Sequence, residues 1–222
     1  MVDPLELGYK LATIYVPFVI ALCFHEYAHG WMAMKKGDNT AEQMGRLTMN
    51  PLVHMDMIGT VVLPILAIMT SIPIFFGWAK PVPFNPRNLK NPKADTFWIA
   101  LAGPLSNILL AVLSAIVIFL IVRLPLTLVT IGTQNAIITI FVQFISINLF
   151  LAIFNMIPLN PLDGGKVLAR FLPVSWNYKL EQNEAMTGMI LLALIMTGAL
   201  SFLAVPVHMA AKALVILATM GA

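Results

Sequence analysis

The feature that most constrains the fold is a series of long apolar stretches that carry almost no charge. Five can be separated, at residues 11–34, 57–79, 96–122, 136–157 and 186–205. A helix of about 20 apolar residues is long enough to cross the ~30 Å hydrocarbon core of a bilayer. Inside a bilayer, only helices and closed barrels satisfy every backbone hydrogen bond. The sequence therefore predicts an all-α polytopic membrane protein, with residues 1–222 forming one transmembrane domain.

Composition supports this class and excludes others. Of the 222 residues, 59% are apolar and only 10% are charged, whereas soluble proteins carry about 25% charged residues. The net charge of +3 is small and the basic residues are scattered, so no nucleic-acid-binding face is expected. The single cysteine, Cys23, excludes an internal disulfide. No signal-peptide pattern precedes the first apolar stretch, so we expect that helix to be retained.

The first apolar stretch contains His-Glu-Tyr-Ala-His at residues 25–29, and Glu26 is its only formally charged residue. Four residues of α-helix advance about 6 Å and slightly more than one turn, so His25 and His29 share a face and can reach one metal ion. Glu26 lies about 100° round the helix, where its carboxylate can accept a proton from a water molecule. Zinc lowers the pKa of such a water, so the predicted chemistry is amide hydrolysis.

A pair of core histidines satisfied by neighbouring groups is the plainer interpretation of this motif. The membrane setting argues against it. An ionisable group in a spanning helix costs roughly 3 kcal/mol or more and persists mainly where it has a function. Three such groups within five residues favour a catalytic metal site.

A hydrolytic zinc site needs three protein ligands and one open position. No further histidine follows His29 at the spacing of the extended H-x-x-G-x-x-H motif, and Glu42 lies in a basic loop. Asp163 is the only acidic residue between Asp95 and Glu181. Its Pro-x-x-Pro-x-Asp-Gly-Gly context predicts an unwound chain that lets the carboxylate turn inward. An ordinary Asp-Gly turn is the alternative, and the presence of H-E-x-x-H favours the ligand.

Together, these patterns resemble the site-2 protease family of intramembrane zinc metalloproteases over about residues 9–205. The resemblance is carried by H-E-x-x-H at residues 25–29, Ala-Gly-Pro at residues 102–104, and Asn-x-x-Pro-x-x-Pro-x-Asp-Gly at residues 155–164. It implies a core of three helices and cleavage of a single-pass substrate within or near the bilayer. It also implies one Zn²⁺ held by His25, His29 and Asp163, with Glu26 as the general base.

Two asparagines and one proline-rich segment have weaker assignments. Asn155 resembles the family's asparagine that faces the active site, and it could bind the substrate backbone or the developing oxyanion. An amide that bridges helices is an equally good interpretation. Asn107 has the same two interpretations, with helix packing favoured. Prolines predict an extended backbone over residues 78–86, which could hold a substrate strand by edge pairing.

The topology depends on whether residues 57–79 span the membrane or enter and return on one side. The re-entrant alternative leaves only Lys10, Arg123 and Lys212 on the other side, and the positive-inside rule favours it. It also lets the two ligand-bearing helices run in the same direction, as the family resemblance implies. We therefore expect a cell-membrane protein with its motif nearer the cytoplasmic face.

Two alternative functions remain open at the level of sequence. A prenyl-protein-type membrane metalloprotease would take its third ligand from a late glutamate, Glu181 or Glu184. A catalytically silent metal-binding scaffold would not need Glu26. The expected partners are a single-pass membrane protein and the lipid bilayer. A second copy of the chain or a regulatory membrane partner is a further candidate. No stretch fits a PDZ or CBS domain, so a prior cut or a partner is expected to present the substrate.

Overall fold

The computed structural model describes residues 3–70, 77–125, 127 and 129–221. Over these residues the chain is helical, and its one β-like feature is an isolated antiparallel bridge between Met55 and Ala79. In chain order the elements are α1 (Pro4–Lys10), η1 (Leu11–Tyr15), α2 (Val16–Lys35), α3 (Thr40–Gln43), α4 (Pro51–His54), η2 (Met57–Val62), α5 (Leu63–Thr70), η3 (Pro86–Asn88), α6 (Pro92–Ile121), α7 (Ile131–Asn155), α8 (Asp163–Ala169), α9 (Val174–Gln182), α10 (Glu184–Met196), η4 (Ala199–Leu203) and α11 (Ala204–Thr219).

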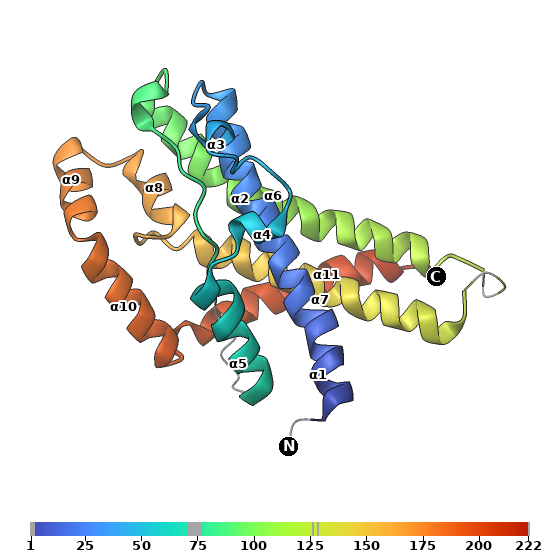
Figure 1. Ribbon diagram of the computed structural model, residues 1–222. Coiled ribbons are helices and arrows are strands. Elements are labelled where there is room, and N and C mark those ends of the chain that lie inside the picture. Colours follow the sequence, from blue (N-terminus) through green and yellow to red (C-terminus); the bar gives the residue numbers. More distant parts are fainter. Residues whose placement is uncertain (1–2, 71–76, 126, 128, 222) are drawn as a thin grey trace.

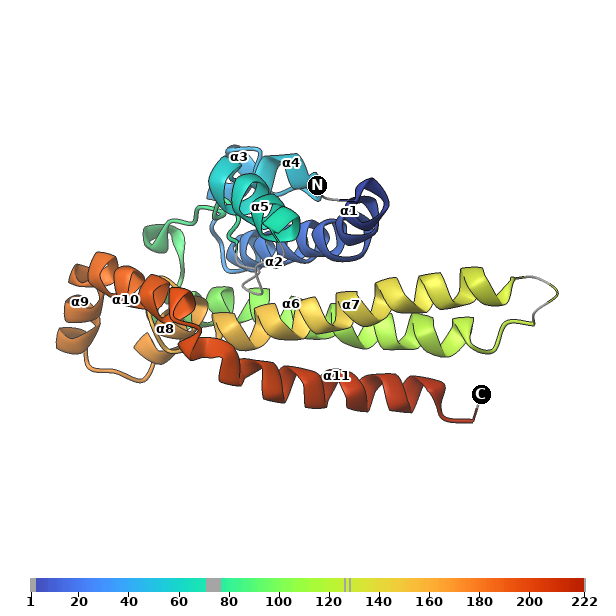
Figure 2. The same cartoon turned by 90° about the horizontal axis from the view of Figure 1, so that it is seen from below.

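Four helices among the described residues are long and apolar enough to cross a membrane, namely Pro4–Lys35, Pro92–Ile121, Ile131–Asn155 and Ala199–Thr219. They are drawn in Figure 1 as α1 with α2, α6, α7 and α11. The prediction of an all-α polytopic membrane protein is thereby confirmed. Figure 2 shows α6, α7 and α11 side by side, and apolar residues of the three helices, including Ile118, Ile145 and Val207, form one buried cluster.

The last predicted span, residues 186–205, is corrected by the structure. The chain forms the shorter helix α10 over Glu184–Met196, and the spanning candidate is Ala199–Thr219. The break lies at Gly198, whose φ of 69° is a left-handed conformation that stops a helix. Pro206, which directly follows the predicted span, lies in the first turn of α11, where a missing N–H removes no intrahelical bond.

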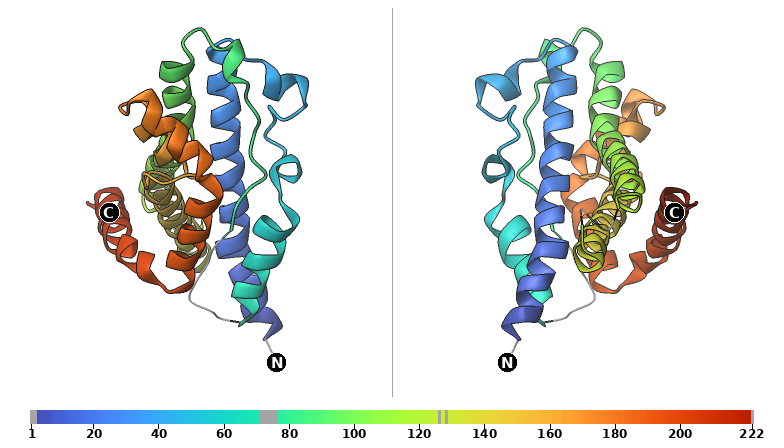
Figure 3. Two further views of the ribbon diagram at one scale, coloured as in Figure 1. Left: turned by 90° about the vertical axis from the view of Figure 1, so that its left-hand side faces the viewer. Right: turned by 90° about the vertical axis from the view of Figure 1, so that its right-hand side faces the viewer.

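Residues 57–79 leave the body of the protein and return beside their own starting point. The outgoing part is η2 and α5, residues 71–76 lie outside the described part of the chain, and residues 77–85 are extended. The amide of Trp78 donates to the carbonyl of Gly59 (3.2 Å), and that of Lys80 donates to the carbonyl of His54 (2.8 Å). The two ends therefore lie next to each other, as the re-entrant alternative requires. We call residues 77–85 the extended segment, and Figure 3 shows it running alongside α2.

An ion pair fixes the end of α2 against the start of α6. Lys36 Nζ lies 3.4 Å from Asp95 Oδ1, and Asp95 is buried in the first turn of α6. Helix α6 contacts α2, α7 and α8. The end of α7 and the start of α8 lie beside the first half of α6 (Figure 1).

Candidate metal centre

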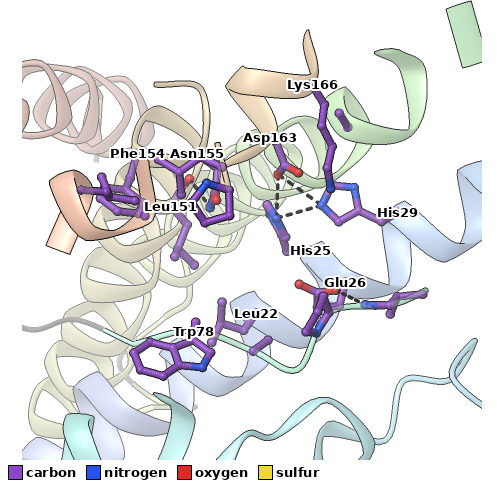
Figure 4. A pocket seen from close by; sticks show the side chains of 18 of the residues that line it. Leu22, His25, Glu26, His29, Trp78, Leu151, Phe154, Asn155, Asp163 and Lys166 are labelled. Carbon is purple, nitrogen blue, oxygen red and sulfur yellow. Dashed lines mark hydrogen bonds and ion pairs between the residues drawn. The ribbon is translucent and has the colours of Figure 1, made fainter. Parts of the chain in front are cut away.

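The structure brings the three predicted metal ligands together. His25 and His29 lie one turn apart in α2, Asp163 is the first residue of α8, and all three are buried. Asp163 Oδ2 lies 3.1 Å from His25 Nε2 and 3.2 Å from His29 Nε2, and the two Nε2 atoms are 3.0 Å apart. Figure 4 shows these side chains pointing toward one another. One ion could be reached by all three ligand atoms.

The far side of the His29 ring fixes which nitrogen carries the proton. His29 Nδ1 lies 2.6 Å from the carbonyl oxygen of Ile99 in α6. A carbonyl oxygen can only accept a hydrogen bond, so Nδ1 is the donor and carries the hydrogen. In the neutral ring, Nε2 then presents a lone pair toward Asp163.

A chain of two buried amides does the same for His25. His25 Nδ1 lies 2.7 Å from Asn107 Oδ1. The Nδ2 group of Asn107 donates to the carbonyl of Ala21 (3.2 Å) and to Asn148 Oδ1 (2.9 Å), so the amide oxygen must be the atom that faces His25. Both asparagines are fully buried. His25 therefore also donates through Nδ1 and presents the lone pair of Nε2.

With both rings neutral, three electron-rich atoms converge in a buried place without a proton between them. Asp163 Oδ2 has no hydrogen-bond partner among the described residues. Unpaired acceptors this close repel each other and are costly to bury, unless a cation lies among them. Two imidazoles and one carboxylate suit Zn²⁺, and ligating histidines typically donate their other ring N–H to a carbonyl or carboxylate oxygen. The residues present therefore fit the metal.

Gly103 allows α6 to pass directly over the two histidine rings. A Cβ at this position would lie 2.5 Å from His29 Cε1 and Nε2 and 2.6 Å from His25 Cε1. Those distances are too short for any non-bonded carbon contact. Glycine at residue 103 is therefore needed for the metal ligands to keep their positions, beyond the helix packing that its small size also allows.

Two further glycines place Asp163. The chain turns between the end of α7 at Asn155 and the start of α8, and the first turn of α8 lies against this connection. A Cβ on Gly164 would overlap the carbonyl of Ile157, and a Cβ on Gly165 would come within 2.8 Å of the amide nitrogen of Asn160. Close approach of main chain to main chain therefore sets the position of the carboxylate.

Glu26 lines the cavity beside the ligands and is tied to the extended segment. Its Oε2 accepts a hydrogen bond of 2.7 Å from the amide of Val82. Arg46 in turn fixes the segment, because its Nη2 donates to the carbonyls of Lys80 (2.7 Å) and Pro81 (3.2 Å). The sequence did not single out Val82 or Arg46, since a backbone donor and a distant guanidinium leave no local motif.

The far end of the extended segment is held by Asp38, which is buried just beyond α2. Its carboxylate accepts hydrogen bonds from the amide of Asn85, the side-chain amide of Asn88 and the hydroxyl of Thr40. Burial alone would raise the pKa of Asp38, but these hydrogen bonds outweigh it and lower the pKa below its ordinary value.

The cavity that contains the ligands has a volume of about 550 Å³. Asn155 lines it, and its Nδ2 donates to the carbonyl of Leu151 in its own helix. Asn107 does not line it and is fully buried behind His25. Of its two interpretations the sequence favours helix packing, and its side chain bridges His25 of α2 and Asn148 of α7. A contact of Asn107 with substrate stays a prediction. Glu184 lines the same cavity, but neither it nor Glu181 joins the group that could hold a metal.

Comparison with known proteins gives one family and two relatives. Residues 13–198 match the family model described as Peptidase family M50. The chain is 32% identical over 182 residues to "Putative zinc metalloprotease YwhC" of Bacillus subtilis, which covers 82% of this chain and 79% of the relative. It is 25% identical over 201 residues to "Putative zinc metalloprotease Rip2" of Mycolicibacterium smegmatis, covering 90% of this chain and 73% of the relative. No solved structure matches the chain significantly.

Proposed function

The chain belongs to peptidase family M50, the site-2 protease family, and from this premise we propose that it is a zinc endopeptidase that cleaves within the membrane. Its substrate is a single-pass membrane protein, cut in or near the transmembrane segment as a step of regulated proteolysis. The observation that carries the proposal is the buried convergence of His25 Nε2, His29 Nε2 and Asp163 Oδ2 in a cavity that Glu26 also lines.

Each residue of the site has a separate role in the proposed hydrolysis. Zinc, when bound by His25, His29 and Asp163, supplies Lewis-acid chemistry that lowers the pKa of a water molecule and polarises a carbonyl. Glu26 would accept a proton from the attacking water, and the amide of Val82 holds one of its carboxylate oxygens in place. Asn155 offers an amide at the cavity wall to the substrate backbone or to the oxygen on which charge develops.

The extended segment gives the substrate a backbone to pair with. Hydrolysis needs an extended peptide, since the scissile bond of a helix is enclosed by its own hydrogen bonds. Trp78 and Lys80 already pair with residues 54–59 through one edge of the segment, so an incoming strand would use the other edge. Replacing residues 80–84 with a flexible linker should abolish cleavage while zinc binding persists, and undiminished cleavage would exclude this role.

The central test separates metal binding from catalysis. Full-length Glu26→Gln protein should retain zinc at the level of the parent and lose proteolysis, because the amide cannot accept the water proton. In cells that carry Glu26→Gln in place of the parent, single-pass membrane fragments should accumulate and be detectable by proteomics. Zinc retention with no difference between the variant and the parent in any fragment would instead favour a silent metal-binding scaffold.

The prenyl-protein-type alternative is tested at the third ligand. Zinc content should fall with Asp163→Asn and remain with Glu184→Gln, whereas the alternative requires the opposite result. The presence of Glu184 at the cavity wall makes this pair well matched, since both carboxylates face the same space.

We also propose that the protein lies in the cytoplasmic membrane with the metal centre nearer the cytoplasmic face. A single cysteine introduced by Lys35→Cys, in a Cys23→Ala background, reports the side on which α2 ends. It should react with an impermeant maleimide in inverted vesicles and not in intact cells. Labelling in intact cells would reverse the orientation.

A further inference from the structure

A second cavity of about 670 Å³ adjoins the catalytic one on the side of the apolar helices. It lies along α7, between the start of α2 on one side and η4 with α11 on the other. The two cavities share four wall residues, which are Gly77, Leu151, Phe154 and Ile195. A chain segment lying in this second cavity therefore leads directly to the metal ligands.

The walls are mostly apolar, but four polar side chains line them. The hydroxyl of Ser146 donates to the carbonyl of Val142 in its own helix, and the other three are more unusual. Gln143 is in the middle of the spanning helix α7, His208 is near the middle of the span Ala199–Thr219, and Ser201 lies near its start. All three residues are exposed. None has a side-chain hydrogen-bond partner within the described part of the chain.

Polar groups at this depth need an explanation, because acyl chains cannot hydrogen-bond them. A polar side chain that faces lipid is costly, and those in membrane-spanning helices typically face a partner helix, a cavity or a substrate path. Gln143 and His208 face the same groove from two different helices. A partner that carried a hydrogen-bonding side chain at mid-membrane depth would satisfy both.

We infer that this groove binds the transmembrane helix of the substrate, and that Gln143 and His208 select substrates with a polar uncharged residue, such as asparagine, near the middle of that helix. The inference rests on the proposed proteolytic function and adds a substrate requirement to it. Continuity with the catalytic cavity favours the substrate over a second copy of the chain, because a permanently seated copy would close this route to the metal centre.

Two designed peptides can test the requirement. Both are lysine-flanked leucine/alanine transmembrane helices with a dansyl group, and they differ only in a central asparagine or leucine. They are titrated into full-length Glu26→Gln protein reconstituted in phosphatidylcholine/phosphatidylglycerol vesicles, with energy transfer from tryptophan as the readout. The asparagine peptide should bind about fivefold tighter, which corresponds to about 1 kcal/mol and matches a single intramembrane hydrogen bond.

The variants Gln143→Leu and His208→Leu should each reduce this preference, and the double variant should bind the two peptides within about twofold of each other. Both substitutions make the helices more apolar, so insertion and zinc content should not change. Asn135→Leu is the matched control: Asn135 is an exposed amide of α7 that does not line the groove, and its variant should keep the full preference.

Several results would overturn the inference. The first is that the groove of Glu26→Gln protein binds the two peptides equally or binds neither. The second is that the preference for the asparagine peptide persists in the double variant. The third is that Asn135→Leu removes this preference. Peptides with a photoreactive central residue should cross-link to α7 or α11, and cross-links elsewhere, or a chain-to-chain cross-link in the groove, would also contradict it. Because binding is measured with Glu26→Gln, its failure is independent of whether the parent cleaves its substrate.

Discussion

The two halves of the metal centre are positioned by different physical means. In the histidine half, His25 and His29 of α2 are oriented by hydrogen bonds that their Nδ1 atoms donate to oxygen acceptors in α6. In the aspartate half, Asp163 is placed by main-chain contact, because Gly164 and Gly165 let α8 pack against the connection that follows α7. Ring orientation needs partners that specify a tautomer, whereas a carboxylate needs only to be delivered to the right place.

Helix α6 contributes to the histidine half in two ways. It supplies the acceptors Ile99 and Asn107, and between them it presents Gly103, which lets the helix approach the rings. Substitutions that remove a metal ligand, block the close approach of α6 or remove a hydrogen bond should therefore weaken zinc binding to different extents. The predictions below are ordered from the largest expected effect to the smallest.

The largest effect is expected from the ligand of the aspartate half. Asp163→Asn should lower zinc affinity on the order of 1,000-fold or more, because a neutral amide replaces the one anionic ligand. Zinc content per chain, measured by mass spectrometry after purification, is the readout. Glu184→Gln serves as the control, and a variant at Asp163 that kept its zinc would remove this residue from the ligand set.

The next largest effect should come from close approach. Gly103→Ala places a methyl group 2.5 Å from the His29 ring, and displacing both rings should weaken zinc binding by about 100-fold. Competition with a chromogenic chelator measures the affinity. Gly188→Ala is the matched control, because its nearest neighbour would be 3.8 Å away. Equal affinities for these two variants would show that α6 can move away from the rings at little cost.

Hydrogen bonds in the histidine half should matter less than sterics. Asn107→Leu removes the acceptor for His25 Nδ1 and should weaken zinc binding by about 10-fold, while Asn148→Leu, one amide further away, should cost only about threefold. If the relay orients the ring, Asn107→Asp should recover most of the affinity, since a carboxylate also accepts from Nδ1. A loss in Asn148→Leu as large as that in Asn107→Leu would indicate disruption of helix packing instead.

The smallest effect on the metal centre is expected at Asp38, outside both halves. Asp38→Asn should destabilise the fold by roughly 1–2 kcal/mol and leave zinc affinity unchanged. Because the native pKa of Asp38 is lowered, its contribution is present above the unfolded pKa of about 3.9 and is lost as pH falls toward the native pKa. The difference in melting temperature between parent and variant should therefore shrink below about pH 4, and a constant difference would exclude ionic stabilisation.

The ligands themselves were accessible from sequence, since H-E-x-x-H in an apolar helix fixes two of them by helical spacing. Asp163 followed from the scarcity of acidic residues between Asp95 and Glu181. The supporting groups were not accessible in the same way. Asn148 and Val82 act through contacts between residues more than 40 positions apart in the chain, and such contacts depend on helix packing that no local pattern encodes.

The helix boundaries show a similar limit. Four of the predicted apolar stretches overlap observed helices, whereas the last, residues 186–205, ends next to Pro206 and contains the helix break at Gly198. A proline is tolerated in the first turn of a helix and interrupts the helix only at later positions. Which of the two applies to Pro206 depends on where the preceding helix ends. In this chain the helix break at Gly198, which has a left-handed φ, determines where η4 and α11 begin.

The acceptor for His29 is the main-chain carbonyl of Ile99. Every amino acid carries that oxygen, so no single codon change at residue 99 can delete it. A substitution at residue 99 therefore leaves the acceptor for His29 in place. His25 depends on the side-chain amide of Asn107, which a point mutation can remove. Random mutagenesis should accordingly yield loss-of-function alleles at residue 107 far more often than at residue 99, although each residue supplies the acceptor for one ring.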